Sequence, residues 1–251
     1  MNRRRALAMF GTVGLAGAAG CLSDELEYTA EPAAIPDATD QGYEADGPED
    51  IEFDETIGAA GIERDVHIRT WSVSYADPDD ESVVFLVSTP DVSIAGISAN
   101  PLARLSGADL IARVLDEGLG AADVEGGIQD VEAEDETAVT VLGESRTMEV
   151  YSAVIEADGA EQATESGEIP IKLYVLSFSH EDDVILSVGF HPDMEELAEE
   201  IDEDELPDDV SADELPDDIS DEDAEAETEA TGDDLISLME GIDHPVELDV
   251  E

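Results

Sequence analysis

The feature that most constrains this chain is its first 21 residues, which have the pattern of an export leader. Arg3, Arg4 and Arg5 precede an uncharged run, residues 6–20, of mostly small and apolar side chains. A helix that crosses a bilayer needs about 20 apolar residues, so this run is short for a permanent anchor. A positive segment, a brief apolar segment and a small-residue exit are typical of a secretory signal. We therefore expect residues 1–20 to be removed and the remainder to fold outside the cytoplasm.

The leader ends at Cys21, the only cysteine in the chain. Residues 18–21 (AAGC) resemble a lipobox, in which small residues precede a cysteine that is lipidated and becomes the new N-terminus. Arg3 and Arg4 resemble the pair of a twin-arginine export motif, although Asn2 and Ala6 depart from its usual flanking residues. Because one acyl chain binds membranes only marginally, we expect a two-chain lipid on Cys21. The alternative interpretation is a membrane helix, or an ordinary signal with an incidental cysteine.

Acidic side chains dominate the rest of the chain. The sequence holds 68 Asp and Glu against 9 Lys and Arg, and Lys172 is the only lysine. Two unit charges 10 Å apart in water cost about 0.4 kcal/mol, so dozens of such pairs rival a typical folding free energy of about 5–15 kcal/mol. At 1 M salt the Debye length falls to about 3 Å and most of this repulsion disappears. We therefore expect a halophilic, haloarchaeal protein that unfolds at low salt and is a poor partner for nucleic acid and anionic lipid.

Composition and patterning divide the chain into five parts. We expect a signal peptide at 1–20, a lipidated N-terminus and tether at 21–61, a folded domain at 62–192, an acidic disordered insertion at 193–231, and a C-terminal helix that packs back on the domain, with a tail, at 232–251. The tether is inferred from its many Pro, Ala, Asp, Glu and Gly residues. The insertion is inferred from its 21 acidic residues and its lack of any basic one, because such a segment repels itself.

Hydrophobic periodicity within these parts predicts the fold class. Six segments show the alternation or the apolar run of a strand: 62–75, 82–89, 137–142, 146–155, 168–179 and 184–190. Residues 168–179 carry apolar side chains on both faces, so we expect both faces to be covered along part of this segment. Residues 106–117, and the segment after Thr231, combine a capping-box pattern with one apolar face. The prediction is an α+β fold: a mainly antiparallel sheet of about six strands, two packed helices and a disordered acidic insertion.

Three short segments carry a resemblance to a known family. Residues 88–96 (STPDVSIAG), 100–106 (NPLARLS) and 140–145 (TVLGES) are similar to an uncharacterised family of haloarchaeal lipoproteins, a domain of unknown function. The resemblance covers most of the chain except the acidic insertion. It implies surface anchoring and no particular activity, so it assigns no catalytic residue.

The sequence offers no constellation of residues that indicates a reaction. The histidines do not have the spacing of metal ligands, and polar residues at a strand end are the favoured interpretation of His191 and its neighbours. Residues 221–225 (DEDAE) lack the glycine of a calcium-binding loop, which favours a solvated segment with diffuse cation association. Carboxylates are so abundant that no pair of them indicates glycosidase chemistry. We therefore predict no catalytic, cofactor-binding or metal-binding residues.

These observations favour a lipid-anchored protein on the extracytoplasmic face of the cell membrane, which acts as a non-enzymatic binding or scaffolding module. The expected partner is the membrane, through the N-terminal lipid, and the sequence indicates neither a ligand nor a protein partner. Two alternatives stay open: an extracellular hydrolase with an unrecognised carboxylate site, and an acidic segment that acts as a cation-responsive spacer.

Overall fold

A computed structural model describes residues 25–59, 62–77, 82–94, 97–98, 128–156, 168–200 and 221–247. These residues form ten strands, one 3-10 helix and two α-helices. The helices are η1 (Ala38–Gln41), α2 (Met194–Glu200) and α3 (Asp221–Glu240). The strands are β1 (Glu25–Thr29), β2 (Glu44–Ala59), β3 (Ile62–Asp77), β4 (Ser82–Pro90), β5 (Ser93–Ile94), β6 (Ile97–Ser98), β7 (Ile128–Val141), β8 (Glu144–Glu156), β9 (Glu168–His180) and β10 (Asp183–Pro192).

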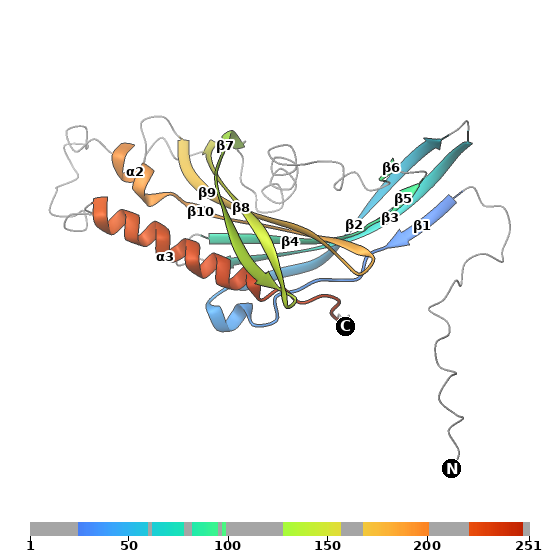
Figure 1. The fold of residues 1–251 in the computed structure, drawn as a ribbon, viewed down its shortest axis with the longest axis horizontal. Coiled ribbons are helices and arrows are strands. Elements are labelled where there is room, and N and C mark those ends of the chain that lie inside the picture. The colour runs from blue at the N-terminus through green and yellow to red at the C-terminus, as the bar shows by residue number, and fades with distance from the viewer. Residues whose placement is uncertain are drawn as a thin grey trace, which may run out of the picture.

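Eight of the strands form one mixed sheet (Figure 1). Its order is β1-β3-β4-β10-β9-β8-β7, with β2 also paired to β3, and only the β1–β3 pair is parallel. The predicted α+β class was therefore wrong, because the described fold is mostly sheet, with eight strands rather than six and only α2 and α3 as α-helices. All six predicted strands are present, and β7 begins already at Ile128. The helix expected at residues 106–117 lies outside the described residues.

The two additional strands lie in residues 21–61, where the composition predicts a tether. β2 has seven acidic residues among its sixteen, which hides any alternation of apolar and polar positions. Such a strand is possible because β2 is an edge of the sheet, where side chains and one row of backbone groups face water. Pro48 and the register shift between Asp46 and Glu49 also suit an edge, since neither could be accommodated easily in a central strand.

The opposite edge of the sheet, β7, is built in the same way. Five of its fourteen residues are acidic, and its pairing with β8 shifts register twice. Charged and bulged edge strands resist pairing with a strand from another chain. Both long edges of the sheet are therefore poor templates for edge-to-edge association.

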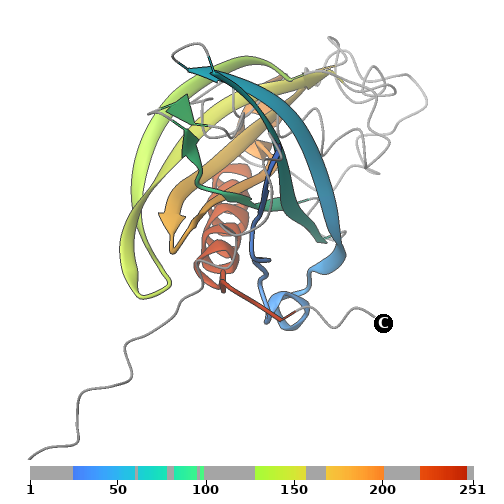
Figure 2. The same cartoon turned by 90° about the vertical axis from the view of Figure 1, so that its right-hand side faces the viewer.

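Helix α3 packs on one face of the sheet, which curves around it (Figure 2). Leu235, Leu238 and Met239 are fully buried against apolar residues of β4, β9 and β10. Gly189 of β10 allows this close approach, because a Cβ atom there would lie 2.7 Å from Leu235 Cδ2. The helix begins at Asp221, well before the start expected at residue 232. Its first half is rich in Glu and Ala, which favour helix although they lack an apolar stripe.

The other face of the sheet is apolar as well. It carries a second cluster that includes Val87, Leu173, Val175, Leu186 and Val188, and Phe85 stacks on Phe190 with ring centroids 6.3 Å apart. The consecutive residues Leu173, Tyr174, Val175 and Leu176 of β9 are all buried although they face alternate sides of the sheet, so the prediction that both faces are covered along part of residues 168–179 is confirmed.

The outer half of the β2–β3 hairpin projects from the body and forms, together with β1, a wing (Figure 1). β4 pairs with β3 only from Trp71 onward, and β1 takes its place beside residues 65–69. The wing has its own small core, in which Val66 and Ile68 are buried under Leu26, Tyr28, Phe53 and Val92.

Ser187 places a polar atom in the core beneath α3. Its hydroxyl oxygen is fully buried and has no hydrogen-bond partner within the described part of the chain. A buried, unsatisfied hydroxyl costs roughly 1–3 kcal/mol, so we expect Ser187→Ala to raise the free energy of unfolding by about 1 kcal/mol. Urea denaturation in molar KCl measures this change. Ser177→Ala, at an exposed position of β9, is the control and should be neutral; a loss of stability in Ser187→Ala would show that the hydroxyl is satisfied.

Candidate functional site

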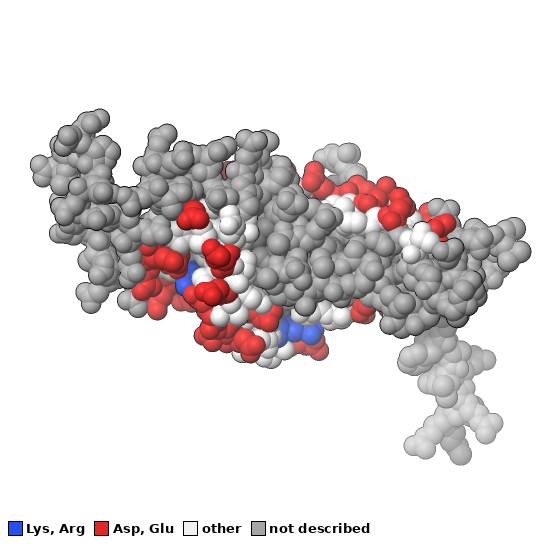
Figure 3. Space-filling view, turned by 90° about the horizontal axis from the view of Figure 1, so that it is seen from above, with Lys and Arg blue, Asp and Glu red and all other residues white. Residues whose placement is uncertain are grey.

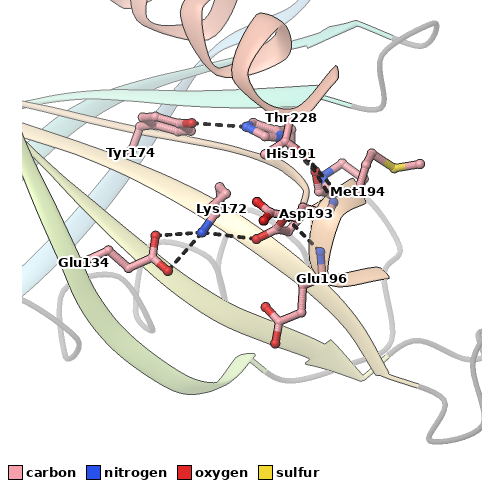
Figure 4. Close-up of polar contacts among 10 residues, drawn as sticks. Glu134, Lys172, Tyr174, His191, Asp193, Met194, Glu196 and Thr228 are labelled. Carbon is pink, nitrogen blue, oxygen red and sulfur yellow. Dashed lines mark hydrogen bonds and ion pairs between the residues drawn. The ribbon is translucent and has the colours of Figure 1, made fainter. Parts of the chain in front are cut away.

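A partly buried polar cluster joins β9 and β10 to the start of α2 (Figure 4). We call it the α2 cluster, and its centre is Lys172. The ammonium nitrogen of Lys172 lies 2.7 Å from Glu134 Oε2 and 3.1 Å from Asp193 Oδ2. The Asp193 side chain is only 3% exposed, so its charge needs a partner inside the protein. The one lysine of a strongly acidic chain supplies that partner.

The same ion pairs fix the protonation state of Lys172. Burial alone would lower its pKa, but the hydrogen bonds to Glu134 and Asp193 outweigh burial and raise the pKa above the usual value. Lys172 therefore stays an ammonium ion. A lysine that acts as a nucleophile or a general base needs a lowered pKa, so this environment does not prepare Lys172 for either role.

Tyr174 and His191 form the second half of the α2 cluster. His191 Nδ1 lies 2.7 Å from the Pro192 carbonyl oxygen, so it donates, and Nε2 is left to accept from the Tyr174 hydroxyl at 3.2 Å. Burial lowers the pKa of His191 and raises that of Tyr174 to about 12. Both groups are therefore neutral near pH 7 and hold their protons in fixed positions.

The α2 cluster connects the two helices that flank residues 201–220. The Asp193 side chain accepts the Glu196 N–H and caps α2, while the Thr228 hydroxyl of α3 accepts the Met194 N–H at 3.0 Å. Gly232 of α3 lies against the Tyr174 hydroxyl, where a Cβ atom would not fit. The cluster thus fastens α2 and α3 to the sheet, and its buried groups are arranged for stability rather than for contact with a substrate.

A second polar network surrounds His244, in the C-terminal tail. His244 Nε2 lies 3.1 Å from Asp183 Oδ2, 3.2 Å from the Glu31 carbonyl oxygen and 3.4 Å from Ser88 Oγ. The Glu31 N–H also donates to Asp183, and the Ser88 hydroxyl donates to the Glu31 carbonyl. Burial raises the pKa of Asp183, although the hydrogen bonds from Glu31 and His244 oppose this rise.

This His244 network has the residue types of a serine hydrolase but not its geometry. In a Ser-His-Asp relay the aspartate and the serine contact opposite nitrogens of the imidazole ring. Here Asp183 and Ser88 both face Nε2, and Ser88 is 1% exposed. The network instead holds the segment around Glu31 and the tail against β4 and β10, next to a backbone bridge between Ala34 and Asp243.

The remaining two histidines lie near the surface. His180 Nδ1 lies 3.1 Å from His244 Nδ1, so one ring nitrogen donates to the other. His67 lies on the wing, where its hydrogen bond to Asp54 is the main cause that raises its pKa. No group of three or more His, Cys, Asp or Glu within the described ranges is arranged to hold a metal ion.

On the face shown in Figure 3, Asp and Glu outnumber Lys and Arg over the described residues. Each Lys or Arg whose side chain the structure describes lies beside a carboxylate: Arg69 beside Glu52, Arg146 beside Glu144, and Lys172 beside Glu134 and Asp193. No unpaired cation is thus available on these described side chains to attract an anionic ligand.

One protein family, described as a domain of unknown function (DUF6517), matches residues 32–243. The chain belongs to this family. No curated protein and no solved structure matches the chain.

The DUF6517 match begins and ends beside the bridge between Ala34 and Asp243. It therefore includes both polar networks except Glu31 and His244, which stand just outside its two limits. The predicted lipidation residue, Cys21, and the export residues Arg3 and Arg4 lie outside the described residues. In the part of the DUF6517 protein that the structure describes, no helix has the length and apolar character to cross a membrane.

Proposed function

We propose that this DUF6517 protein is a lipid-anchored, extracytoplasmic surface protein of a halophilic archaeon, and that its body is a non-enzymatic binding or scaffolding module. The observation that carries the proposal is the position of Cys21. The only cysteine of the chain stands at the end of an export-type leader, where a lipobox-like segment would deliver it for lipidation.

The start of the fold supports an anchor at this position. β1 begins at Glu25, four residues after Cys21, so a lipid on Cys21 would lie at most about 14 Å from the first strand. β1 is paired with β3, and the chain after it is tied to the body through Glu31. An anchor at Cys21 would hold the folded body directly against the membrane surface rather than on a long tether.

The charge distribution and the two polar networks support the other parts of the proposal. Carboxylates cover the edge strands. A concentrated salt solution screens the repulsion between such exposed charges, which suits a halophile. The most enzyme-like residue sets are the α2 cluster, which is partly buried, and the His244 network, and both are engaged in holding helices and terminal segments. These features therefore favour binding or scaffolding by the outer surface as the function of the body.

We expect Cys21→Ser to remove the mature, membrane-bound form. Expression in a haloarchaeal host and detergent-phase partitioning of the membranes provide the measurement. Loss of the lipid should reduce mature-length protein in the detergent phase about tenfold or more, because no described element replaces the anchor. Ser23→Ala is the matched control and should partition like the unaltered protein. Mature-length Cys21→Ser protein that still partitions with detergent would contradict the anchor.

A further inference from the structure

We propose that His180 and His244, together with Asp183, form an acid-sensitive latch. The latch holds two terminal segments of the body together near neutral pH and releases them in mild acid. These segments are residues 30–35, which follow β1, and residues 242–246 of the C-terminal tail. The proposal goes beyond the proposed function, because it concerns contacts within the folded body and does not depend on the lipid.

The latch lies where the two terminal segments meet (Figure 2). Ala34 and Asp243 form an antiparallel backbone bridge, and the Val246 N–H donates to the Pro32 carbonyl at 2.9 Å. Between these contacts, the fully buried side chain of His244 reaches from the tail to the polar ends of β4 and β10. The contacts of this one imidazole therefore decide how firmly the tail and the segment after β1 are held.

The surroundings of His244 Nε2 fix a hydrogen on that atom. Nε2 faces Asp183 Oδ2, the Glu31 carbonyl oxygen and Ser88 Oγ at 3.1–3.4 Å. Asp183 Oδ2 already accepts the Glu31 N–H, and the Ser88 hydroxyl donates its hydrogen to the Glu31 carbonyl at 2.6 Å. Since none of the three oxygens supplies a hydrogen, Nε2 donates, and any further proton on His244 must go to Nδ1.

The other side of the latch has room for a single hydrogen. His244 Nδ1 and His180 Nδ1 are 3.1 Å apart, so one nitrogen must donate and the other must accept. This contact forms whether the pair is neutral or carries one positive charge. When both rings are imidazolium ions, each Nδ1 is a donor and neither can accept. The closed latch therefore holds at most one positive charge on its two imidazoles.

The separated imidazoles have no such limit, and this difference sets the direction of the pH effect. A histidine in water has a pKa of about 6.5, so at pH 5 two separated rings together hold nearly two positive charges. The open state then binds more protons than the closed pair, and the state that binds more protons is favoured as the pH falls. Mild acid therefore opens the latch.

Asp183 acts in the opposite direction and makes the effect smaller. Burial is the main cause that raises its pKa, so the closed state protonates this carboxyl more readily than the open state does. Its proton therefore favours closure as the pH falls. With this opposition included, we expect the ratio of open to closed molecules to rise about tenfold between pH 7 and pH 5, against a limit of tenfold per pH unit for one whole proton.

The other titratable groups around the latch are carboxylates. They come from the segment after β1, the tail, the end of β4 and the β9–β10 turn: Glu31, Asp243, Asp91, Glu181 and Asp182. None of them is paired with a Lys or Arg whose side chain the structure describes. These carboxylates attract protons to the two rings, but they offer no acceptor to either Nδ1 while the rings face each other.

Hydrogen exchange of the complete protein in about 3 M KCl tests the latch at pH 7 and pH 5, after correction for the intrinsic pH dependence of exchange. Trp71 gives a second signal, because its indole N–H donates to the Ala30 carbonyl. His180→Asn is the decisive variant, since its amide can either donate to or accept from His244 Nδ1 and takes up no proton itself. His67→Gln, which removes a histidine on the wing, is the matched control.

We expect exchange in residues 30–35 and 242–246 to become about tenfold faster at pH 5 in the unaltered protein and in His67→Gln, with a red shift of Trp71 emission. Exchange in β9, β10 and α3 should stay unchanged. His180→Asn should show neither effect at the terminal segments. The latch is overturned if exchange there does not rise in the unaltered protein, if it rises equally in His180→Asn, or if the whole sheet exchanges faster along with these segments.

Discussion

Dialysis from about 3 M to 0.1 M KCl is expected to unfold the protein. The folded body concentrates carboxylates on β2 and β7, and the described cations are already paired, so little positive charge remains to offset the repulsion. At 0.1 M salt the Debye length is about 10 Å, and neighbouring charges on one strand repel each other almost fully. The sum of these repulsions is comparable with a whole folding free energy.

Trp71 provides the signal for this experiment. It is the only tryptophan, and its indole N–H donates to the Ala30 carbonyl, so its fluorescence reports contact between β3 and the segment after β1. The charge explanation also predicts that Glu132→Gln with Glu136→Gln, at exposed positions of β7, lowers the KCl concentration needed for folding. A melting temperature that is equal at 0.1 M and 3 M KCl would exclude this account of the acidic surface.

Lys172→Met is expected to lower the free energy of unfolding by about 3 kcal/mol in molar KCl, since removing one member of a buried ion pair costs roughly 3–5 kcal/mol and Lys172 is partly exposed. Methionine keeps most of the side-chain volume, so the loss reports the uncompensated charge of Asp193. Salt should not remove the effect, because a buried pair is screened much less than a surface pair.

Two comparisons separate this charge effect from a general loss of packing. Arg69→Met breaks an exposed pair on the wing and should cost no more than about 1 kcal/mol. Asp193→Asn keeps a residue that can cap α2, and adding it to Lys172→Met should restore part of the lost stability, with a coupling energy of about 1–3 kcal/mol. Additive losses in the double variant would mean that Lys172 does not compensate Asp193.

The sequence predicts the central strands of this fold well and its edges poorly. β3, β4, β9 and β10 are recognisable because buried positions force alternation or a continuous apolar run. β2 escapes the same analysis because a strand at the edge can carry acidic residues at most positions, and its composition then resembles a linker. The first half of α3 is missed for a related reason, since its contacts involve Thr228 and Gly232 rather than an apolar stripe.

The polar networks show a different limit of sequence reasoning. Glu31 and Asp183 are 152 positions apart and His180 and His244 are 64 apart, so no local spacing reveals that they meet. Lys172 did carry a usable signal. Its rarity, as the one lysine among 68 acidic residues, singles it out in the sequence, although its pairing with the buried Asp193 is known only from the structure.

Intact-mass analysis of the protein purified from its native host tests the anchored, extracytoplasmic placement most directly. The placement predicts a chain that starts at Cys21 and is heavier than its amino acids by two lipid chains attached at that residue. A mass that still includes residues 1–20, or a chain that starts at an unmodified Cys21, would contradict it.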